Sequence, residues 1–434
     1  MRLSIADVLA VAPGARLACG DPAAQVEGAF VDSRSPVAGA LFAGLPGEAA
    51  DGGLHAPAAL AGGAAAALVG EAAWDAVGEA LVATGRPVIV AAEPLAVLQA
   101  AGRLALGRLG APVVAVTGSV GKTTTKDILV AMLRAAGVRA EGTPGNRNTE
   151  VGVPMSLMGL PPDTEVAVVE MGMRGTGQIA ELARLAPPRV ACISAIAPVH
   201  LELLGTVEAI AAAKAEVFST LGPGDTAVVP AGEPLLAPHL AALPDGVRVV
   251  EFADLPDGAV ELSVGKAWQR RNAAAALACC EALGMAPPPG TRVEVELSAM
   301  RGQEHPLAVG GTLIEDCYNA NPVAMRAALT DLAGRSGRRV AVLGDMFELG
   351  PDELAYHRGV GELVAELGVD LLVAVGTRAE QYAAGAAGVP SHRFADAAEA
   401  AAGVPGLLRE GDVVLVKASR GMALEAVANA VRER

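Results

Sequence analysis

A lysine set between glycines and hydroxyls is the residue group in this sequence with the clearest chemical use. The stretch TGSVGKTT covers residues 117–124 and follows the apolar run PVVAV. Glycines let a backbone turn its N–H groups inward around an anion, and the next helix presents its positive end. Lys122 would then reach the terminal phosphates of a nucleotide, and the Thr123 hydroxyl would ligate Mg²⁺. The phosphate-binding loop is expected to use Gly118, Ser119, Val120, Gly121, Lys122, Thr123 and Thr124.

The spacing departs from the full pattern G-x-x-x-x-G-K-[ST], because Val116 stands where that pattern has its first glycine. A Gly-Lys-Thr turn can also do no more than cap a helix. A strand-like run precedes the loop and a helix-like segment follows it, and this order favours nucleotide binding over capping.

Three further side chains are candidates for metal or phosphate binding near this loop. Glu170 ends the apolar run VAVVE, and a carboxylate beside phosphates needs a cation to be tolerated. His200 follows the next apolar run, although a lone histidine is more often a packed residue than a ligand. Lys214 interrupts an alanine-rich helix and, taken alone, is a lysine that extends its amine to solvent.

A parallel sheet is needed to bring these side chains together. From residue 112 onward, short and nearly continuous apolar runs alternate with helix-length segments, which predicts a parallel sheet covered by helices on both faces. The pattern resumes after the Pro-rich stretch GMAPPPG. There, polar residues again follow the strands, at Asp345, Thr377, Ser419 and Arg420. Ligands of such sheets bind at the carboxyl ends of the strands.

Composition limits the class of protein. A chain of 434 residues with 52% hydrophobic content exceeds what one core usually holds, so more than one domain is expected. Together with the alternation of apolar runs and helix-length segments, this predicts an α/β fold with three domains, at 1–91, 92–299 and 300–434. The net charge of -15 disfavours nucleic acid as a partner. Five cysteines without a C-x-x-C pair indicate a reducing, cytoplasmic setting. The N-terminus lacks a signal peptide, the alanine-rich runs are too short to span a membrane, and no heptads predict a coiled-coil assembly, so we expect a cytosolic monomer.

Seven segments of the chain, taken in order, resemble the Mur ligases of peptidoglycan synthesis. They are TGSVGKTTTK, GNRNTEVGVP, VEMGMRGTGQI, HLELLGTVEAIAAAKAEVF, CYNANPVAM, LGDMFELG and LVKASRGMALE. The segments YNANP and LGDM-ELG are most similar to the branch that adds D-alanyl-D-alanine. The segment DSRSPVAGALFAGLPGEAADGG resembles a uridine-binding domain, although the usual D-G-H turn reads DGG at residues 51–53. The resemblance implies a small N-terminal α/β uridine-binding domain, a central P-loop ATPase domain and a C-terminal Rossmann-like α/β domain.

The resemblance also implies an activity and a set of site residues. The activity is ATP-dependent amide formation between UDP-N-acetylmuramoyl-tripeptide and D-alanyl-D-alanine through an acyl phosphate, which gives the pentapeptide precursor. Thr123 and Glu170 would hold one Mg²⁺ and His200 a second, and Lys214 matches a position that several Mur ligases carbamylate. Positions implied for the nucleotide are Asn272, Arg301 and Asn319. Positions implied for the UDP-muramyl substrate are Ser33, Arg34, Asn146, Asn148 and Thr149.

Other functions are compatible with parts of this pattern. Another ligase of the superfamily, either a diaminopimelate- or lysine-adding Mur ligase or a folylpolyglutamate synthase, would share the phosphate loop. A regulatory P-loop ATPase would hydrolyse ATP without an acceptor site in residues 300–434. Because an acyl phosphate is labile in water, a ligase is expected to close its cleft, and we predict a hinge near residues 296–301.

Overall fold

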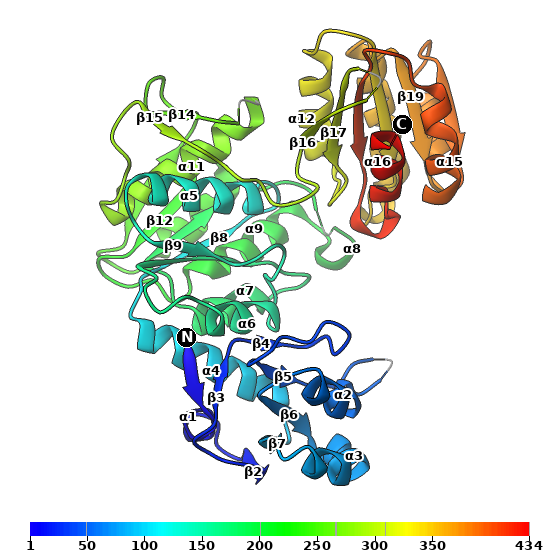
Figure 1. Cartoon of the computed structure of the whole chain (residues 1–434). Helices are drawn as coiled ribbons and strands as arrows, with labels where there is room; N and C mark the ends of the chain where they lie inside the picture. Colours follow the sequence, from blue (N-terminus) through cyan, green and yellow to red (C-terminus); the bar gives the residue numbers. More distant parts are fainter. Residues whose placement is uncertain (49, 200, 265–266, 309, 434) are drawn as a thin grey trace.

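The computed structural model describes residues 1–434 except 49, 200, 265–266, 309 and 434. Three bodies follow one another along the chain, each built on one larger sheet (Figure 1). These three sheets confirm the predicted α/β class. No helix of the described residues is both long enough and apolar enough to cross a membrane.

The N-terminal body holds a five-stranded sheet in the order β2-β7-β6-β5-β4. All neighbours are parallel except β2 and β7. Apolar runs such as Ala66–Gly70 are buried along their whole length, as expected for strands covered on both faces. The elements are β1 Arg2–Ser4, α1 Ile5–Ala10, β2 Arg16–Cys19, β3 Gln25–Glu27, β4 Ala29–Phe30, β5 Leu41–Ala43, η1 Gly52–His55, α2 Ala56–Ala61, β6 Ala66–Gly70, α3 Glu71–Ala83 and β7 Val88–Ala91.

The central body holds a six-stranded, all-parallel sheet in the order β13-β12-β11-β8-β10-β9. Its first strand, β8, therefore lies in the middle, and the chain leaves it toward β9 and β10 before it returns to β11 on the other side. Such a switch point opens a crevice at the carboxyl ends of the strands. The elements are α4 Pro94–Leu109, β8 Val113–Thr117, α5 Lys122–Ala135, β9 Ala140–Gly142, α6 Gly152–Met158, β10 Val166–Glu170, α7 Gln178–Leu185, β11 Val190–Ile193, α8 Leu201–Leu204, α9 Val207–Ala215, η2 Glu216–Phe218, β12 Thr226–Pro230, η3 Pro234–Leu236, α10 Ala237–Ala241, β13 Arg248–Phe252, β14 Val260–Leu262, α11 Ala267–Leu283 and β15 Thr291–Val293.

Helices cover both faces of the central sheet, and the side chains of β8 pack against helices on each face. Val114 and Val116 pack into the core beneath α5 and α11. Val113 and Ala115 point the other way, into the core with α7 and α9. Alternate side chains of a strand face opposite sides of the sheet. An uninterrupted apolar run is therefore required, and its small residues let helices approach closely.

The C-terminal body repeats this plan with the sheet order β16-β17-β21-β18-β19-β20, in which only β16 is antiparallel. Helices α12 to α14 cover one face, and α15 and α16 cover the other. The elements are β16 Gln303–Pro306, β17 Thr312–Asp316, α12 Pro322–Ala333, β18 Arg339–Gly344, η4 Gly350–Asp352, α13 Glu353–Glu366, β19 Leu371–Val375, α14 Ala379–Gly385, β20 Ser391–Phe394, α15 Ala397–Leu407, β21 Val413–Lys417, η5 Arg420–Met422 and α16 Glu425–Arg432.

Two segments join the bodies in different ways. Helix α4 lies between the first two bodies (Figure 1), and its buried residues Val97, Leu98 and Ala101 belong to the core of the N-terminal sheet. The link between the second and third bodies contains no regular element between β15 and β16. Asp127 of α5 tethers it, because the Ser298 N–H donates to Oδ2 of Asp127 at 2.8 Å. The predicted hinge at 296–301 falls in this link, and its motion stays a prediction.

Candidate active site

The glycine loop between β8 and α5 is tight because its surroundings leave no room for side chains. Gly118 and Gly121 have φ of 143° and 85°, in the left-handed region that glycine tolerates. A Cβ atom on Gly118 would collide with the Ser194 hydroxyl, and one on Gly121 would collide with the Asn272 side chain. Asn272 of α11 is therefore placed directly against the loop; its contact with the nucleotide stays a prediction from the family resemblance.

Neighbouring backbone groups hold the loop in place. The Ser119 N–H donates to the Ala195 carbonyl oxygen at 2.8 Å, and its hydroxyl donates to the Ala197 carbonyl at 3.0 Å. The Ser194 hydroxyl donates to the carbonyl of Val120 at 2.6 Å. The segment after β11 thus holds the loop in its conformation, a role that no local sequence pattern predicts.

Lys122 begins α5 and folds back over the loop. Its Nζ donates to the Gly118 carbonyl oxygen at 2.8 Å. Burial lowers the pKa of Lys122, Glu170 raises it, and the charge of Arg301 lowers it. Three groups from two bodies therefore share one electrostatic environment at the crevice, which is where a triphosphate would need its cations.

Two oxygen atoms beside this lysine are buried and unpaired. Thr123 Oγ1 and Glu170 Oε2 lack a hydrogen-bond partner among the residues that the structure describes, and each residue is 1% exposed. Glu170 ends β10 and pairs in register with Val116 of β8. A buried polar atom without a partner is costly, so such atoms mark places where an ion or a ligand belongs.

The donor set fits Mg²⁺. A hydroxyl and a carboxylate oxygen are hard ligands of the kind that Mg²⁺ binds, together with waters and phosphate oxygens. No three His, Cys, Asp or Glu side chains gather into a metal cluster within the described part of the chain. The second predicted ligand, His200, lies outside the described residues. Thr123 and Glu170 therefore remain the two candidates that can be placed.

Lys214 of α9 lies in the same environment and is 1% exposed. Burial lowers its pKa far below the usual value, the charge of Lys122 lowers it further, and Glu216 and Glu170 raise it. The expectation that Lys214 simply extends its amine to solvent is wrong for this fold, because α9 packs this face against the sheet. Burial thus favours the neutral form of this amine over its charged form.

The loop before α6 meets the carboxylate. The Asn148 Nδ2 donates to Oε1 of Glu170 at 2.7 Å, so one oxygen of Glu170 is engaged and the other is free. The Thr149 hydroxyl accepts from the Gly152 N–H at 3.3 Å and serves the start of α6. Asn146 is exposed and reaches toward the C-terminal body, where it hydrogen-bonds to Tyr318.

Tyr318 is a neighbour of the site that the sequence analysis missed, and Lys417 is a buried lysine at a strand end of the C-terminal body. The Arg301 guanidinium carbon lies 3.9 Å from the centre of the Tyr318 ring. Burial raises the pKa of Tyr318, and the charges of Arg301 and Arg420 lower it. Lys417 ends β21 and donates to Oδ2 of Asp316 at 2.7 Å and to the Asn319 carbonyl at 3.1 Å. A lysine that ends an apolar run was the available signal.

Not every predicted residue reaches the crevice. The side-chain oxygen of Asn319 accepts from the N–H of Ala320 at 2.9 Å, so its first role is to shape its own turn. Ser33 and Arg34 belong to the N-terminal body, in the segment after β4, and β4 contacts α6 of the central body. The Arg34 side chain is bound by Asp32 at 2.8 Å.

The sequence matches two family models, the Mur ligase middle domain at residues 116–266 and the glutamate ligase domain of Mur ligases at residues 300–420. It is 35% identical over 430 residues to the UDP-N-acetylmuramoyl-tripeptide–D-alanyl-D-alanine ligase of Synechocystis sp., with 93% of this chain and 91% of that protein covered. The corresponding ligase of Escherichia coli is 32% identical over 442 residues, with 93% of each chain covered.

Solved structures agree. MurF from Acinetobacter baumannii superposes with a TM-score of 0.79 at 28% identity, covering 94% of both chains. The MurF ligase of Thermotoga maritima, solved in complex with ADP, gives a TM-score of 0.74 at 26% identity, covering 94% of this chain and 97% of that one. The chain therefore belongs to the Mur ligase family, in its MurF branch of UDP-N-acetylmuramoyl-tripeptide–D-alanyl-D-alanine ligases.

Proposed function

We propose that the protein joins D-alanyl-D-alanine to UDP-N-acetylmuramoyl-tripeptide at the expense of ATP and so forms the UDP-muramyl pentapeptide. The observation that carries this proposal is the extent of the similarity. About a third of all residues match curated ligases of this activity over more than nine-tenths of the chain. The crevice around Lys122 supplies the phosphate-binding parts that such a reaction needs.

The chemistry explains why cations gather at the crevice. A carboxylate resists attack by an amine because its carbon is electron-rich and oxide is a very poor leaving group. Transfer of the γ-phosphoryl group of ATP to the tripeptide carboxylate gives an acyl phosphate, and the dipeptide amine then displaces phosphate through a tetrahedral intermediate. Phosphoryl transfer depends mainly on positioning and on stabilising the charge of the peripheral oxygens.

Each residue at the crevice has a role in this scheme. The loop N–H groups and Lys122 hold the phosphates, and Thr123 with Glu170 would hold Mg²⁺, assisted by His200 at a second ion. Bound Mg²⁺ would neutralise phosphate charge and reduce the repulsion between ATP and the tripeptide carboxylate. Asn148 orients Glu170 through its bond to Oε1. Asn272 lies against the loop, where the adenosine would extend.

Lys214 is proposed to be carbamylated. The neutral amine of a lysine with a depressed pKa attacks carbon dioxide, forms a C–N bond and releases one proton. The product is an anionic carbamate, which would replace a buried cation beside Lys122 with a metal-binding group. The position of Lys214 near Glu170 and Lys122 supports this proposal.

The remaining predicted residues would bind the other substrate and close the site. Ser33 and Arg34 would contact the uridine part, and Asn146 with Thr149 the muramyl part. Arg301 and Asn319 would approach the nucleotide when the C-terminal body rotates about residues 296–301. Small-angle scattering should show compaction when a nucleotide analogue and the UDP-substrate are both present. Identical curves with and without them would contradict closure.

Mass spectrometry tests the activity itself. The protein, ATP, Mg²⁺, UDP-muramyl tripeptide and D-alanyl-D-alanine should yield the pentapeptide, while L-alanyl-L-alanine should not be incorporated. ATP hydrolysis that proceeds equally without either organic substrate would instead indicate a regulatory ATPase. Incorporation of a diamino acid or of glutamate in place of the dipeptide would indicate another ligase of the superfamily.

A further inference from the structure

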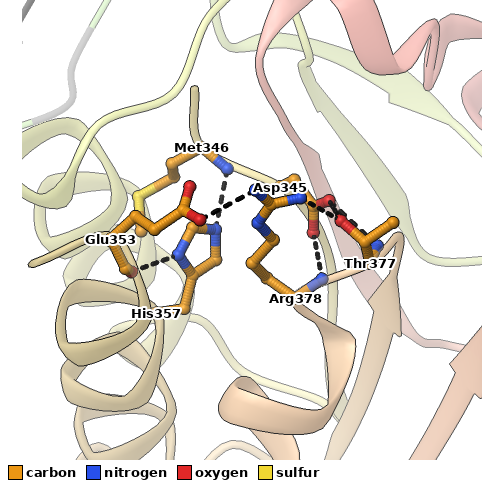
Figure 2. A network of polar contacts seen from close by, with 6 residues as sticks. All are labelled: Asp345, Met346, Glu353, His357, Thr377 and Arg378. Carbon is orange, nitrogen blue, oxygen red and sulfur yellow. Dashed lines mark hydrogen bonds and ion pairs between the residues drawn. The ribbon is translucent and has the colours of Figure 1, made fainter. Parts of the chain in front are cut away.

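Two buried rings hold the chain on either side of Asp345, where β18 ends. The Tyr382 hydroxyl donates to the Gly344 carbonyl oxygen at 2.9 Å. The Met346 N–H donates to Nε2 of His357 at 2.9 Å (Figure 2). The two rings contact each other edge to face, with centroids 4.9 Å apart, and both residues are 0% exposed. Tyr382 and His357 therefore act as one clamp on the backbone at residues 344–346.

The hydrogen bonds of His357 define its tautomer. Its Nδ1 lies 2.6 Å from the Glu353 carbonyl oxygen, which can only accept, so Nδ1 carries the proton. Its Nε2 faces a backbone N–H, which can only donate, so Nε2 carries a lone pair. The ring is therefore neutral, and both nitrogens are used. Protonation would set two N–H groups against each other at Met346.

The clamped loop is bent and points one apolar side chain outward. Glu348 and Gly350 have φ of 63° and 72°, and a non-glycine residue in this region is strained. Met346 is buried, whereas Phe347 is 41% exposed. The Phe347 N–H donates to the Ser419 hydroxyl at 2.9 Å. Gly350 lies next to Leu201 of α8, so the loop borders the central body.

We propose that His357 is a positioning residue for the amine-bearing dipeptide. Its neutral ring fixes the backbone of residues 345–350. This loop lines the path by which D-alanyl-D-alanine enters the site. The exposed Phe347 ring on the loop offers an apolar surface for the methyl groups of the dipeptide. The inference rests on the proposed function, in which the first two bodies bind the UDP-substrate and ATP. The acceptor must then enter from the carboxyl edge of the third sheet.

The clamp is sensitive to acid. Burial is the main cause that lowers the pKa of His357, while the carboxylates of Asp345 and Glu353 raise it and the Arg378 guanidinium lowers it. Tyr382, the other titratable group on the ring, stays neutral because burial raises its pKa. The lone pair is thus present at neutral pH and is lost as pH falls below the ordinary range of histidine. Loss of the clamp should then weaken acceptor binding before the fold fails.

Substitutions of His357 can distinguish a role in positioning the dipeptide from a role in the stability of the fold. In H357L the acceptor atom for Met346 is gone, and we expect KM for D-alanyl-D-alanine to rise about fivefold while KM for ATP stays the same. In H357Q the side-chain oxygen can accept from Met346, so KM for the dipeptide should stay within about twofold of wild type, and its acid-side rise should disappear. Equal changes in both KM values, or an unchanged acid limb in H357Q, would overturn the proposal.

A second measurement does not depend on activity or on the leucine variant folding. The Met346 amide should be strongly protected from hydrogen exchange in wild type at neutral pH, and its protection factor should fall in acid, whereas in H357Q the protection factor should stay high. Y382F, which removes only the bond to Gly344, should speed exchange near residue 344 and raise KM for the dipeptide. Fast exchange at Met346 in wild type would refute the clamp even if the pentapeptide forms. Absence of the pentapeptide with slow exchange would refute only the proposed function.

Discussion

The central and C-terminal sheets share one architecture, but the buried carboxylates Glu170 and Asp345 at their carboxyl edges are hydrogen-bonded in different ways. At the central edge, Thr123 Oγ1 and Glu170 Oε2 are buried without a partner in the described chain. At the C-terminal edge, Asp345 is equally buried, yet Oδ2 accepts from the N–H and the hydroxyl of Thr377 and Oδ1 accepts from the N–H of Arg378, at 2.9 to 3.0 Å.

This difference separates two uses of a buried carboxylate. A carboxylate whose oxygens are all satisfied fixes loops, and its removal costs stability. A carboxylate with an oxygen left over, such as Glu170, can take a cation there, and we expect its removal to cost activity first. Substitutions at the two edges should therefore fail in different assays.

The largest loss is expected for Lys122→Ala. This change removes the cation that folds over the loop, and such electrostatic contacts are worth about 10²-fold or more in rate. ADP and phosphate release, measured with both organic substrates, gives the effect. Arg134→Ala is the matched control, because Arg134 lies at the other end of α5 and, among the described residues, donates to Oε1 of Glu141 and to the carbonyl oxygen of Ala140. Near-normal turnover of Lys122→Ala would remove the loop from the mechanism.

Glu170→Gln should lower turnover about 10²-fold and raise the Mg²⁺ concentration needed for nucleotide binding, because the neutral amide cannot replace the missing charge. Calorimetric titration of ADP at several Mg²⁺ concentrations measures this shift. Glu165→Gln is its control, since Glu165 stands just before β10, at the end opposite to Glu170, and accepts from the Arg139 N–H. An unchanged Mg²⁺ requirement in Glu170→Gln would contradict a metal at this oxygen.

Lys214→Arg should lower turnover about tenfold, since arginine keeps the charge but cannot form a carbamate. In wild type supplied with ¹³C-bicarbonate, NMR should show a carbamate signal, because burial lowers the pKa of Lys214 and only the neutral amine reacts. Lys126→Arg should retain the signal, because the amine of Lys126 is already bound to Asp127 and to Thr143. A signal that persists in Lys214→Arg would end this proposal.

Asp345→Asn should have the smallest effect on turnover and act mainly on stability. The amide nitrogen would face a donor, and leaving one buried group unpaired costs about 1–3 kcal/mol. Urea unfolding followed by circular dichroism measures the loss. Asp352→Asn, at an exposed position before α13 where the side chain makes no cap, should change little. If Asp345→Asn abolished turnover with stability intact, the two edges would not differ as described.

Much of this arrangement could be predicted from the sequence, because it depends on residues that are close together along the chain. Strand, glycine turn and helix are set by neighbouring residues, so the loop at Gly118 to Thr124 and the carboxylate at the end of VAVVE could be predicted along with the α/β class. The position of Asn272 beside the loop came only from the family resemblance, because 150 residues separate it from Lys122.

Other features could not be predicted, since they depend on how distant segments meet. The frame that Ser194 gives to the loop, the Arg301–Tyr318 stack and the clamp of His357 on Met346 each join segments that no local pattern relates. Lys214 is the clearest example of a residue whose environment could not be predicted from the sequence. Its alanine-rich helix suggested a solvated amine, whereas packing of α9 against the sheet buries it next to Lys122.

The sequence by itself determined the elements, their order and the chemical types available at each strand end, because these follow from the period of apolar residues and from local backbone preference. Only the tertiary structure decided which polar atoms are satisfied and which are left over. Hydrogen bonding and burial are properties of the assembled neighbourhood, so the strand-end carboxylate of Asp345 is fully bonded whereas that of Glu170 keeps one oxygen without a partner among the described residues.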